Sequence, residues 1–126
     1  LKEKKTHDTW EQGLIQIFYA VKENKPFIMN VYRCVSRERV ERYLNPLTDA
    51  LVMGVVEEQS VGMSVRDDDK QFIAKIYTYI LVGVMLDWIC DDMKEEPEQL
   101  VERLALAIQG NISSALERFR TDKRRA

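Results

Sequence analysis

The sequence predicts an all-α protein that forms a single domain. Apolar residues recur at helical spacing along most of the chain, and no segment alternates apolar and polar residues as a strand does. Only 5 Gly and 3 Pro interrupt 126 residues, which is too few for a loop-rich fold. Apolar residues make up 45% and charged residues 32% of the chain. This composition and length indicate one folded domain with its own core.

Two helices are expected in the first third of the chain. The first, over residues 8–25, carries its apolar residues on one face: Trp10, Leu14, Ile17, Phe18 and Val21. Asp8 or Thr9 is available as its N-cap. Pro26 ends it, because the residue before a proline is pushed out of the helical conformation. A short second helix begins at that proline and is expected to turn Phe27 and Val31 inward.

A third, long helix is predicted over residues 37–59. Its apolar residues stay in one phase: Val40, Leu44, Leu47, Leu51 and Val55. Ser36 is available to cap its start. Pro46 lies inside it and is expected to kink it, because the proline ring removes a hydrogen bond and crowds the preceding turn. Gly62 and the run from Arg66 to Asp69 mark the next break.

The fourth helix, from about Asp68 to Asp92, contains the most apolar stretch, YTYILVGVMLDWIC at 77–90. Its uncharged run from Ile76 to Leu86 has 11 residues, whereas a membrane span needs roughly 20 apolar residues. A membrane span is therefore not expected. A helix that is apolar nearly all round must be covered by its own core or by another subunit.

A fifth helix is expected to start at Pro97 and to carry an apolar stripe: Leu100, Leu104, Ile108, Ile112, Leu116 and Phe119. Gly110 should weaken this helix by about 1 kcal/mol without interrupting it. The short connection predicts that the fourth and fifth helices pack antiparallel. We expect them to pair with the same two helices of a second subunit in a four-helix contact. Gly83 would then allow close approach of a partner backbone, or else be a packing gap within one chain.

The groups that commonly carry catalysis or hold cofactors are missing from the sequence. His7 is its one histidine, which leaves histidine-based acid-base catalysis and a di-iron bundle without their residues. The scattered glycines form neither a P-loop nor a dinucleotide fingerprint. Cys34 and Cys90 are isolated and predict neither a zinc site nor a disulfide framework. No catalytic residue, metal or other cofactor is expected.

The charge and the N-terminal segment bear on partners and location. A net charge of −2 gives no general attraction to nucleic acid or to anionic membranes. Residues 1–10 are charged and are not followed by an apolar signal region, and two unpaired thiols suit a reducing compartment. We therefore expect a cytoplasmic protein.

Two stretches of the chain resemble one family. AVKENKPFIMNVYRCVSRERVERYL, at 20–44, is similar to a segment of TetR-type transcriptional regulators in which an E-N-x-x-F turn joins two helices. YTYILVGVMLDWIC, followed by DDMKEEPEQLVERL, resembles their next-to-last helix, acidic loop and final helix. The likeness spans about Asp8 to Phe119 and is nearest to regulators of dihydroxyacetone kinase operons.

This resemblance implies a five-helix C-terminal regulatory domain that dimerises through its last two helices and holds an effector pocket. The helix-turn-helix that binds DNA in these regulators lies N-terminal to that domain, and residues before Asp8 are too few to supply it. The alternative function is a stand-alone helical module that recognises another protein through the apolar face of the fourth helix.

The candidate site residues follow from the regulator interpretation. Polar-tipped aromatic side chains on apolar helices can line a pocket, which makes Tyr19, Tyr32 and Tyr77 candidates for ligand binding. The candidates for a homodimer interface lie on the last two helices: Gly83, Val84, Leu86, Asp87, Trp88, Ile108, Ile112 and Leu116. The partners expected are a second copy of the chain and a small-molecule effector or partner protein, with DNA contacted only through the missing N-terminal domain.

Overall fold

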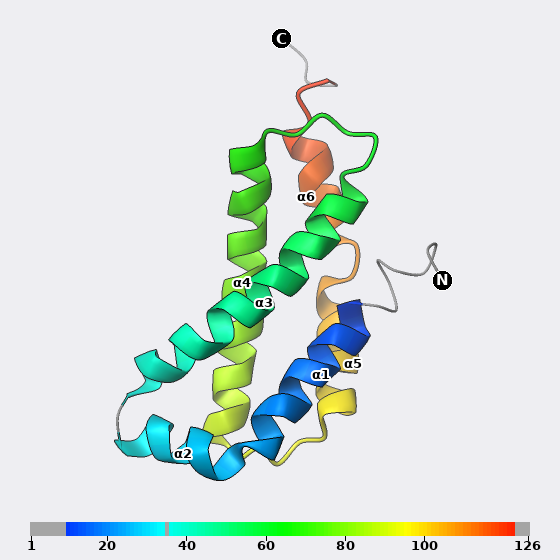
Figure 1. Ribbon diagram of the computed structural model, residues 1–126. Helices are drawn as coiled ribbons and strands as arrows, with labels where there is room; N and C mark the ends of the chain where they lie inside the picture. The colour runs from blue at the N-terminus through cyan, green and yellow to red at the C-terminus, as the bar shows by residue number, and fades with distance from the viewer. Residues whose placement is uncertain (1–9, 35, 123–126) are drawn as a thin grey trace.

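The computed structural model describes residues 10–34 and 36–122, and this part of the chain confirms the all-α class. Its helices are α1 (Trp10–Glu23), α2 (Lys25–Cys34), α3 (Arg37–Gln59), α4 (Asp67–Cys90), α5 (Pro97–Ile108) and α6 (Asn111–Phe119). The long helices α3 and α4 cross each other, α1 and α2 lie at one end of this pair, and α5 and α6 run back antiparallel to α4 (Figure 1).

Helices α1 and α2 are joined by a tight turn at Asn24, whose amide donates to the Val21 carbonyl oxygen at 3.1 Å. Helix α1 buries Leu14, Phe18 and Val21, as its spacing predicts, and its predicted N-cap lies outside the described residues. The prediction for α2 is wrong at Phe27, which is 68% exposed. Helix α2 begins at Lys25, before the proline, and packs through Ile28 and Met29 instead.

Helix α3 has the predicted bounds and the predicted cap. The Ser36 hydroxyl oxygen accepts a hydrogen bond from the Arg39 amide at 3.1 Å, which satisfies one amide of the first turn. Leu47, expected inside, is 42% exposed, and Thr48 is fully buried in its place. The Thr48 hydroxyl lies 3.9 Å from the Met85 sulfur of α4. A threonine on the buried face is invisible to a search for apolar spacing, which explains the error.

Helix α4 packs along α3 and is the central helix of the molecule. It is long and apolar enough to cross a membrane, but half of its apolar window is buried inside the protein. Its buried residues come from one side of the helix and include Ile73, Leu81, Met85 and Ile89. This burial is what a core helix of a folded protein shows.

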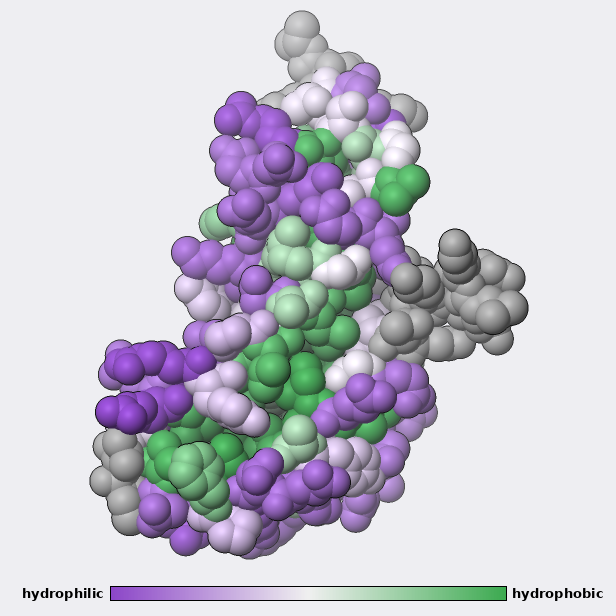
Figure 2. All heavy atoms as spheres, viewed as in Figure 1, coloured by the Kyte–Doolittle hydropathy of each residue, from purple (hydrophilic) through white to green (hydrophobic). Residues whose placement is uncertain are grey.

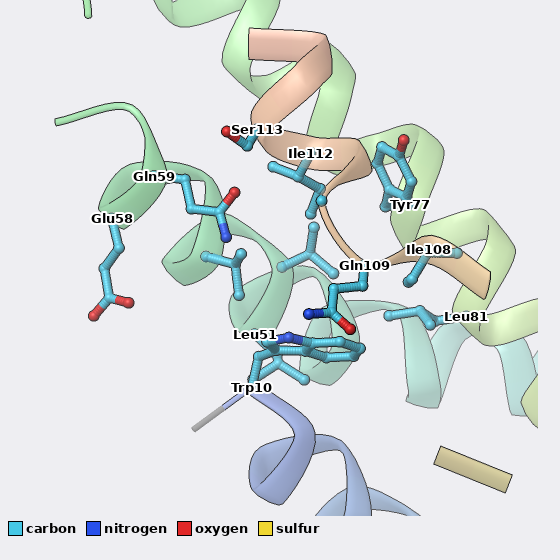
Figure 3. A pocket seen from close by; sticks show the side chains of 13 residues that line it. Trp10, Leu51, Glu58, Gln59, Tyr77, Leu81, Ile108, Gln109, Ile112 and Ser113 are labelled. Atoms are coloured by element: carbon cyan, nitrogen blue, oxygen red, sulfur yellow. The ribbon is translucent and has the colours of Figure 1, made fainter. Parts of the chain in front are cut away.

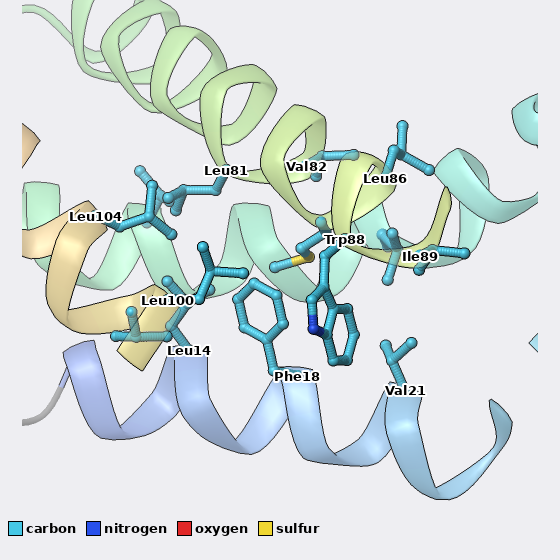
Figure 4. Packing of buried hydrophobic residues seen from close by; sticks show 14 of the residues in the cluster. Leu14, Phe18, Val21, Leu81, Val82, Leu86, Trp88, Ile89, Leu100 and Leu104 are labelled. Atoms are coloured by element: carbon cyan, nitrogen blue, oxygen red, sulfur yellow. The ribbon is translucent and has the colours of Figure 1, made fainter. Parts of the chain in front are cut away.

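Trp88 holds the end of α4 against α1 and the following loop. Its indole ring packs edge-on against Phe18, with ring centroids 4.8 Å apart and an interplanar angle of 79° (Figure 4). Its Nε1 donates a hydrogen bond of 2.9 Å to the Glu95 carbonyl oxygen. The buried polar atom of the indole is therefore satisfied, and the acidic loop is tied to the core.

The single last helix that was predicted is divided into α5 and α6 at Gln109 and Gly110. Gly110 has a φ of 82°, in the left-handed region that glycine adopts without steric cost. The apolar phase continues across the break, so periodicity alone could not reveal it. After the division α5 packs mainly against α1, whereas α6 packs against α3 and α4. The Thr121 amide donates to the Ser64 carbonyl oxygen at 2.8 Å and ties the end of α6 to the α3–α4 loop.

Candidate functional site

A cavity of about 440 Å³ lies where α1, α3, α4 and the α5–α6 junction meet (Figure 3). Its walls are largely apolar and come from all of these elements: Trp10, Leu51, Val55, Leu81, Ile108 and Ile112. On the face shown in Figure 2, apolar side chains gather along the seam between α3 and α1, with polar side chains around them. The division of the last helix contributes to the cavity, since Gly110 and both flanking helices line it.

A few polar side chains are set into these walls, among them Gln59 near the end of α3. Figure 3 shows the Gln59 amide turned toward the interior of the cavity. Its Oε1 is buried and has no hydrogen-bond partner within residues 10–34 and 36–122. An acceptor left in this way costs about 1–3 kcal/mol, so Gln59 places an unsatisfied polar atom in the wall of the cavity.

The charge of the cavity is set by Glu58, whose carboxylate is the acidic group of its lining. Figure 3 shows the Glu58 side chain pointing away from Ile112 and Tyr77, at the edge of the cavity. No lysine, arginine or histidine is found among the described residues that line it. Besides this carboxylate, the described lining carries the uncharged polar side chains of Gln59, Tyr77, Gln109 and Ser113.

Of the three tyrosines predicted to bind a ligand, Tyr77 lines this cavity and the other two do not. The Tyr19 hydroxyl donates to the Glu98 carboxylate at 2.8 Å, and this bond raises the pKa of Tyr19. Tyr32 lies beside Cys90, and the hydrogen bond with that thiol raises its pKa, with burial adding to the effect. Trp10 and Gln59 were not among the residues predicted from the sequence. They line the cavity because the tertiary fold brings the start of α1 close to the end of α3.

The predicted interface residues are divided between surface and interior. Leu86, Trp88 and Leu116 are buried within their own chain. Ile108 and Ile112 line the cavity, at its α5–α6 wall. Asp87 is exposed, and Gly83 and Val84 are half-buried. An alanine Cβ built at Gly83 would meet nothing within 4 Å, so no backbone of the same chain requires the glycine.

An exposed apolar stripe, which we call the α4 stripe, runs along the outer side of α4. It consists of Phe72, Ile76, Tyr79 and Ile80. Phe72 and Tyr79 are 53% and 59% exposed, and the spacing of four, three and one residues keeps all of these side chains on one side of the helix. Gly83 and Asp87 continue the same side toward the end of α4. Large side chains of this kind, gathered on one helix face, are typical of a contact with another chain.

The described residues contain no group of three or more His, Cys, Asp or Glu that could hold a metal ion. Over residues 8–110, the sequence matches the family model of the C-terminal region of TetR-type transcriptional regulators. This match covers most of the chain and, of the helices that line the cavity, α1, α3, α4 and α5, whereas α6 lies beyond it. The chain belongs to this family.

Membership agrees with the architecture, since the matched region is all-helical in the part that the structure describes and contains the α4 stripe and most of the cavity lining. No curated protein and no solved structure matches the chain. The family therefore defines the class of the domain, which is the C-terminal region of a TetR-type transcriptional regulator.

Proposed function

We propose that this chain is the dimerisation and effector-sensing domain of a TetR-like transcriptional regulator. The observation that carries the proposal is the family match over residues 8–110. DNA binding would belong to an N-terminal helix-turn-helix outside these 126 residues. The domain itself would bind an effector without catalysing a reaction, and the regulator would act in the cytoplasm. The quoted stretches at 20–44 and 77–104 lead us to propose the dihydroxyacetone kinase operon subgroup.

The cavity supports the sensing role. Its volume of about 440 Å³ is within the range of small-molecule sites, and its apolar walls with a few polar groups have the usual composition of such sites. Gln59, Tyr77 and Ser113 contribute polar groups to this lining.

The α4 stripe supports the dimer. We propose that it forms the centre of an isologous contact in which α4 packs against its copy, with Gly83, Val84 and Asp87 at the same surface. Leu86, Trp88 and Leu116 would support the contact from inside each subunit, because their own chain buries them. This proposal keeps Gly83, Val84 and Asp87 of the predicted interface and leaves out Ile108 and Ile112, which line the cavity.

Helix α4 also offers a route from ligand to dimer. Tyr77 and Leu81 face the cavity, whereas their neighbours Ile76 and Ile80 belong to the α4 stripe. A ligand that favours one position of α4 would therefore change how two subunits meet. The spacing of two DNA-reading heads would change with it.

Analytical ultracentrifugation of the 126-residue chain over a wide dilution series tests the dimer. We expect a dimer at high concentration that dissociates at a measurable concentration. The double variant Ile76→Glu with Ile80→Glu should be monomeric throughout, because it places like charges opposite one another at the contact.

Phe27→Glu is the matched control, since Phe27 is an apolar residue of α2 that is 68% exposed and does not belong to the stripe. It should dimerise like the parent chain. A parent chain that is monomeric at every concentration would remove the dimerisation role and would favour the second candidate. That candidate is a stand-alone helical module that binds a different protein through the α4 stripe.

A further inference from the structure

The break between α5 and α6 divides a segment whose sequence is that of one helix. Apolar residues keep a spacing of four across the break, at Leu104, Ile108, Ile112 and Leu116, and no proline follows Pro97 in the chain. The break depends on Gly110, whose φ is 82°. An α-helix requires a negative φ at every residue, so the helix ends where Gly110 takes this conformation.

The division leaves the first turn of α6 without helical hydrogen bonds. Along the described backbone, helical bonding stops at the Gln109 amide, which donates to Ala105, and starts again at the Ser114 amide, which donates to Gly110. The N-cap residue of α6 is Gly110, which has no side chain to accept the amides between them. Local hydrogen bonding therefore favours one continuous helix.

Contacts with other helices hold α6 in the divided position. Helix α5 packs mainly against α1, whereas α6 packs against α3 and α4. Leu116 is fully buried there, and the Thr121 amide donates to the Ser64 carbonyl oxygen at 2.8 Å. Tertiary contacts and local hydrogen bonds thus act in opposite directions at Gly110.

The cavity wall requires the division. Residues 108–110, 112 and 113 all line the cavity, and Figure 3 shows Gln109 and Ile112 turned into it. Successive residues of a continuous helix are rotated by roughly 100°, which would place Gly110 nearly opposite Ile108. One side of a continuous helix could not present all of these residues, so this wall exists while α5 and α6 are divided.

We propose that Gly110 is a two-state hinge that joins or divides α5 and α6, and that occupancy of the cavity selects the divided state. This inference rests on the proposed sensing function and identifies its moving part. A ligand that contacts the divided wall binds that state in preference and raises its population. Because α6 packs against α4, the change is passed to the helix that carries the α4 stripe.

Two variants at Gly110 separate the hinge from a simple loss of stability. An added Cβ would meet nothing within 4 Å, so both substitutions act through the backbone. Gly110→Ala should shift the ratio of joined to divided states about thirtyfold toward the joined helix, because alanine is strained at positive φ and is the best helix former. Gly110→Asn is the matched control, since asparagine tolerates the left-handed conformation and favours helix ends.

Hydrogen exchange of the 126-residue chain, followed by NMR, measures the joined state. In Gly110→Ala, the protection factors of the Ile112 and Ser113 amides should rise about twofold, because these amides gain helical partners in the joined fraction. The protection of the core should fall in the same variant as its stability falls. Gly110→Asn should leave both amides as they are in the parent chain.

Naphthalene, an uncharged probe for apolar walls, tests the coupling to the cavity. Its dissociation constant is measured by NMR titration, following the indole N–H signal of Trp10, which lines the cavity. It should bind the parent chain and Gly110→Asn alike and Gly110→Ala about twofold more weakly, because only the divided fraction binds. Saturating naphthalene should return the Ile112 and Ser113 amides of Gly110→Ala to the protection of the parent chain.

Three results would overturn the inference, and they differ in what they leave. Unchanged or lower protection of Ile112 and Ser113 in Gly110→Ala would remove the joined state and keep the cavity as a sensing site. Equal naphthalene binding to a joined Gly110→Ala chain would remove the coupling between hinge and cavity. Naphthalene that binds none of the chains would remove the coupling and the support that the cavity gives to sensing, while the ultracentrifugation result would still decide the dimer.

Discussion

Single side chains and single backbone angles decide several features of this molecule. Ser36 caps α3 through its hydroxyl, and Trp88 joins α4 to α1 and to the acidic loop. Both residues are conspicuous in the sequence, the first as a polar residue before a helix and the second as an aromatic residue in an apolar run. Gly110 is different, because its positive φ is a property of the folded chain.

Two glycines give opposite predictions for the same substitution. Gly110→Ala should lower the free energy of unfolding by about 1 kcal/mol, because alanine is strained in the left-handed region. Gly54→Ala should raise it by about 0.5–1 kcal/mol, because Gly54 lies within α3 and an added Cβ would meet nothing within 4 Å. Urea denaturation of both variants measures the two changes. An increase in the free energy of unfolding with Gly110→Ala would contradict the left-handed conformation at Gly110.

The end of α6 is closed by an ion pair that predicts a pH effect. The Arg120 guanidinium donates two hydrogen bonds, of 3.0 and 2.9 Å, to the two carboxylate oxygens of Asp122. This bond lowers the pKa of Asp122 from its usual 3.8 to about 2. The lowered pKa means that the stabilisation is complete above about pH 4 and disappears as the pH falls toward 2.

An NMR titration of the Asp122 carboxyl carbon measures this midpoint directly. We expect it near pH 2 in the parent chain and near the ordinary value of an aspartate in Arg120→Gln, which cannot form the charged pair. The same variant should speed hydrogen exchange at the Thr121 amide, which donates to Ser64. A midpoint that does not move in Arg120→Gln would show that the ion pair is not formed in solution.

The helices differ in how well a sequence pattern describes them. Helix α3 has the predicted bounds because its cap and apolar phase are both local signals. Phe27 and Leu47 were predicted to be buried because they are apolar and lie at helical spacing, but both side chains are exposed. Helix α4 is apolar on two sides, so the sequence pattern requires both sides to be covered. The pattern does not say which of the two sides is covered by the same chain. The structure leaves the α4 stripe on the side that α3 does not cover.

The whole molecule should be more stable as a dimer than as separate chains. If the α4 stripes of two subunits meet, the melting temperature should rise with protein concentration, because the dimer is formed only by folded chains. Differential scanning calorimetry at several concentrations measures this dependence. The Ile76→Glu and Ile80→Glu double variant should melt at a temperature independent of concentration. A parent chain with the same independence would contradict the dimer.

The positions of the helices, the all-α class and the likeness to TetR-type regulators could all be determined from the amino-acid order. Helix formation depends on residues three or four positions apart and on caps at each end, and these relations are written along the chain. The cavity could not be found in this way, since Trp10, Gln59, Tyr77 and Ile112 meet only after four helices have packed. The same holds for the division at Gly110 and for the exposed side of α4. Contacts between distant residues, rather than local spacing, decide which apolar faces a chain covers and where it leaves a cavity.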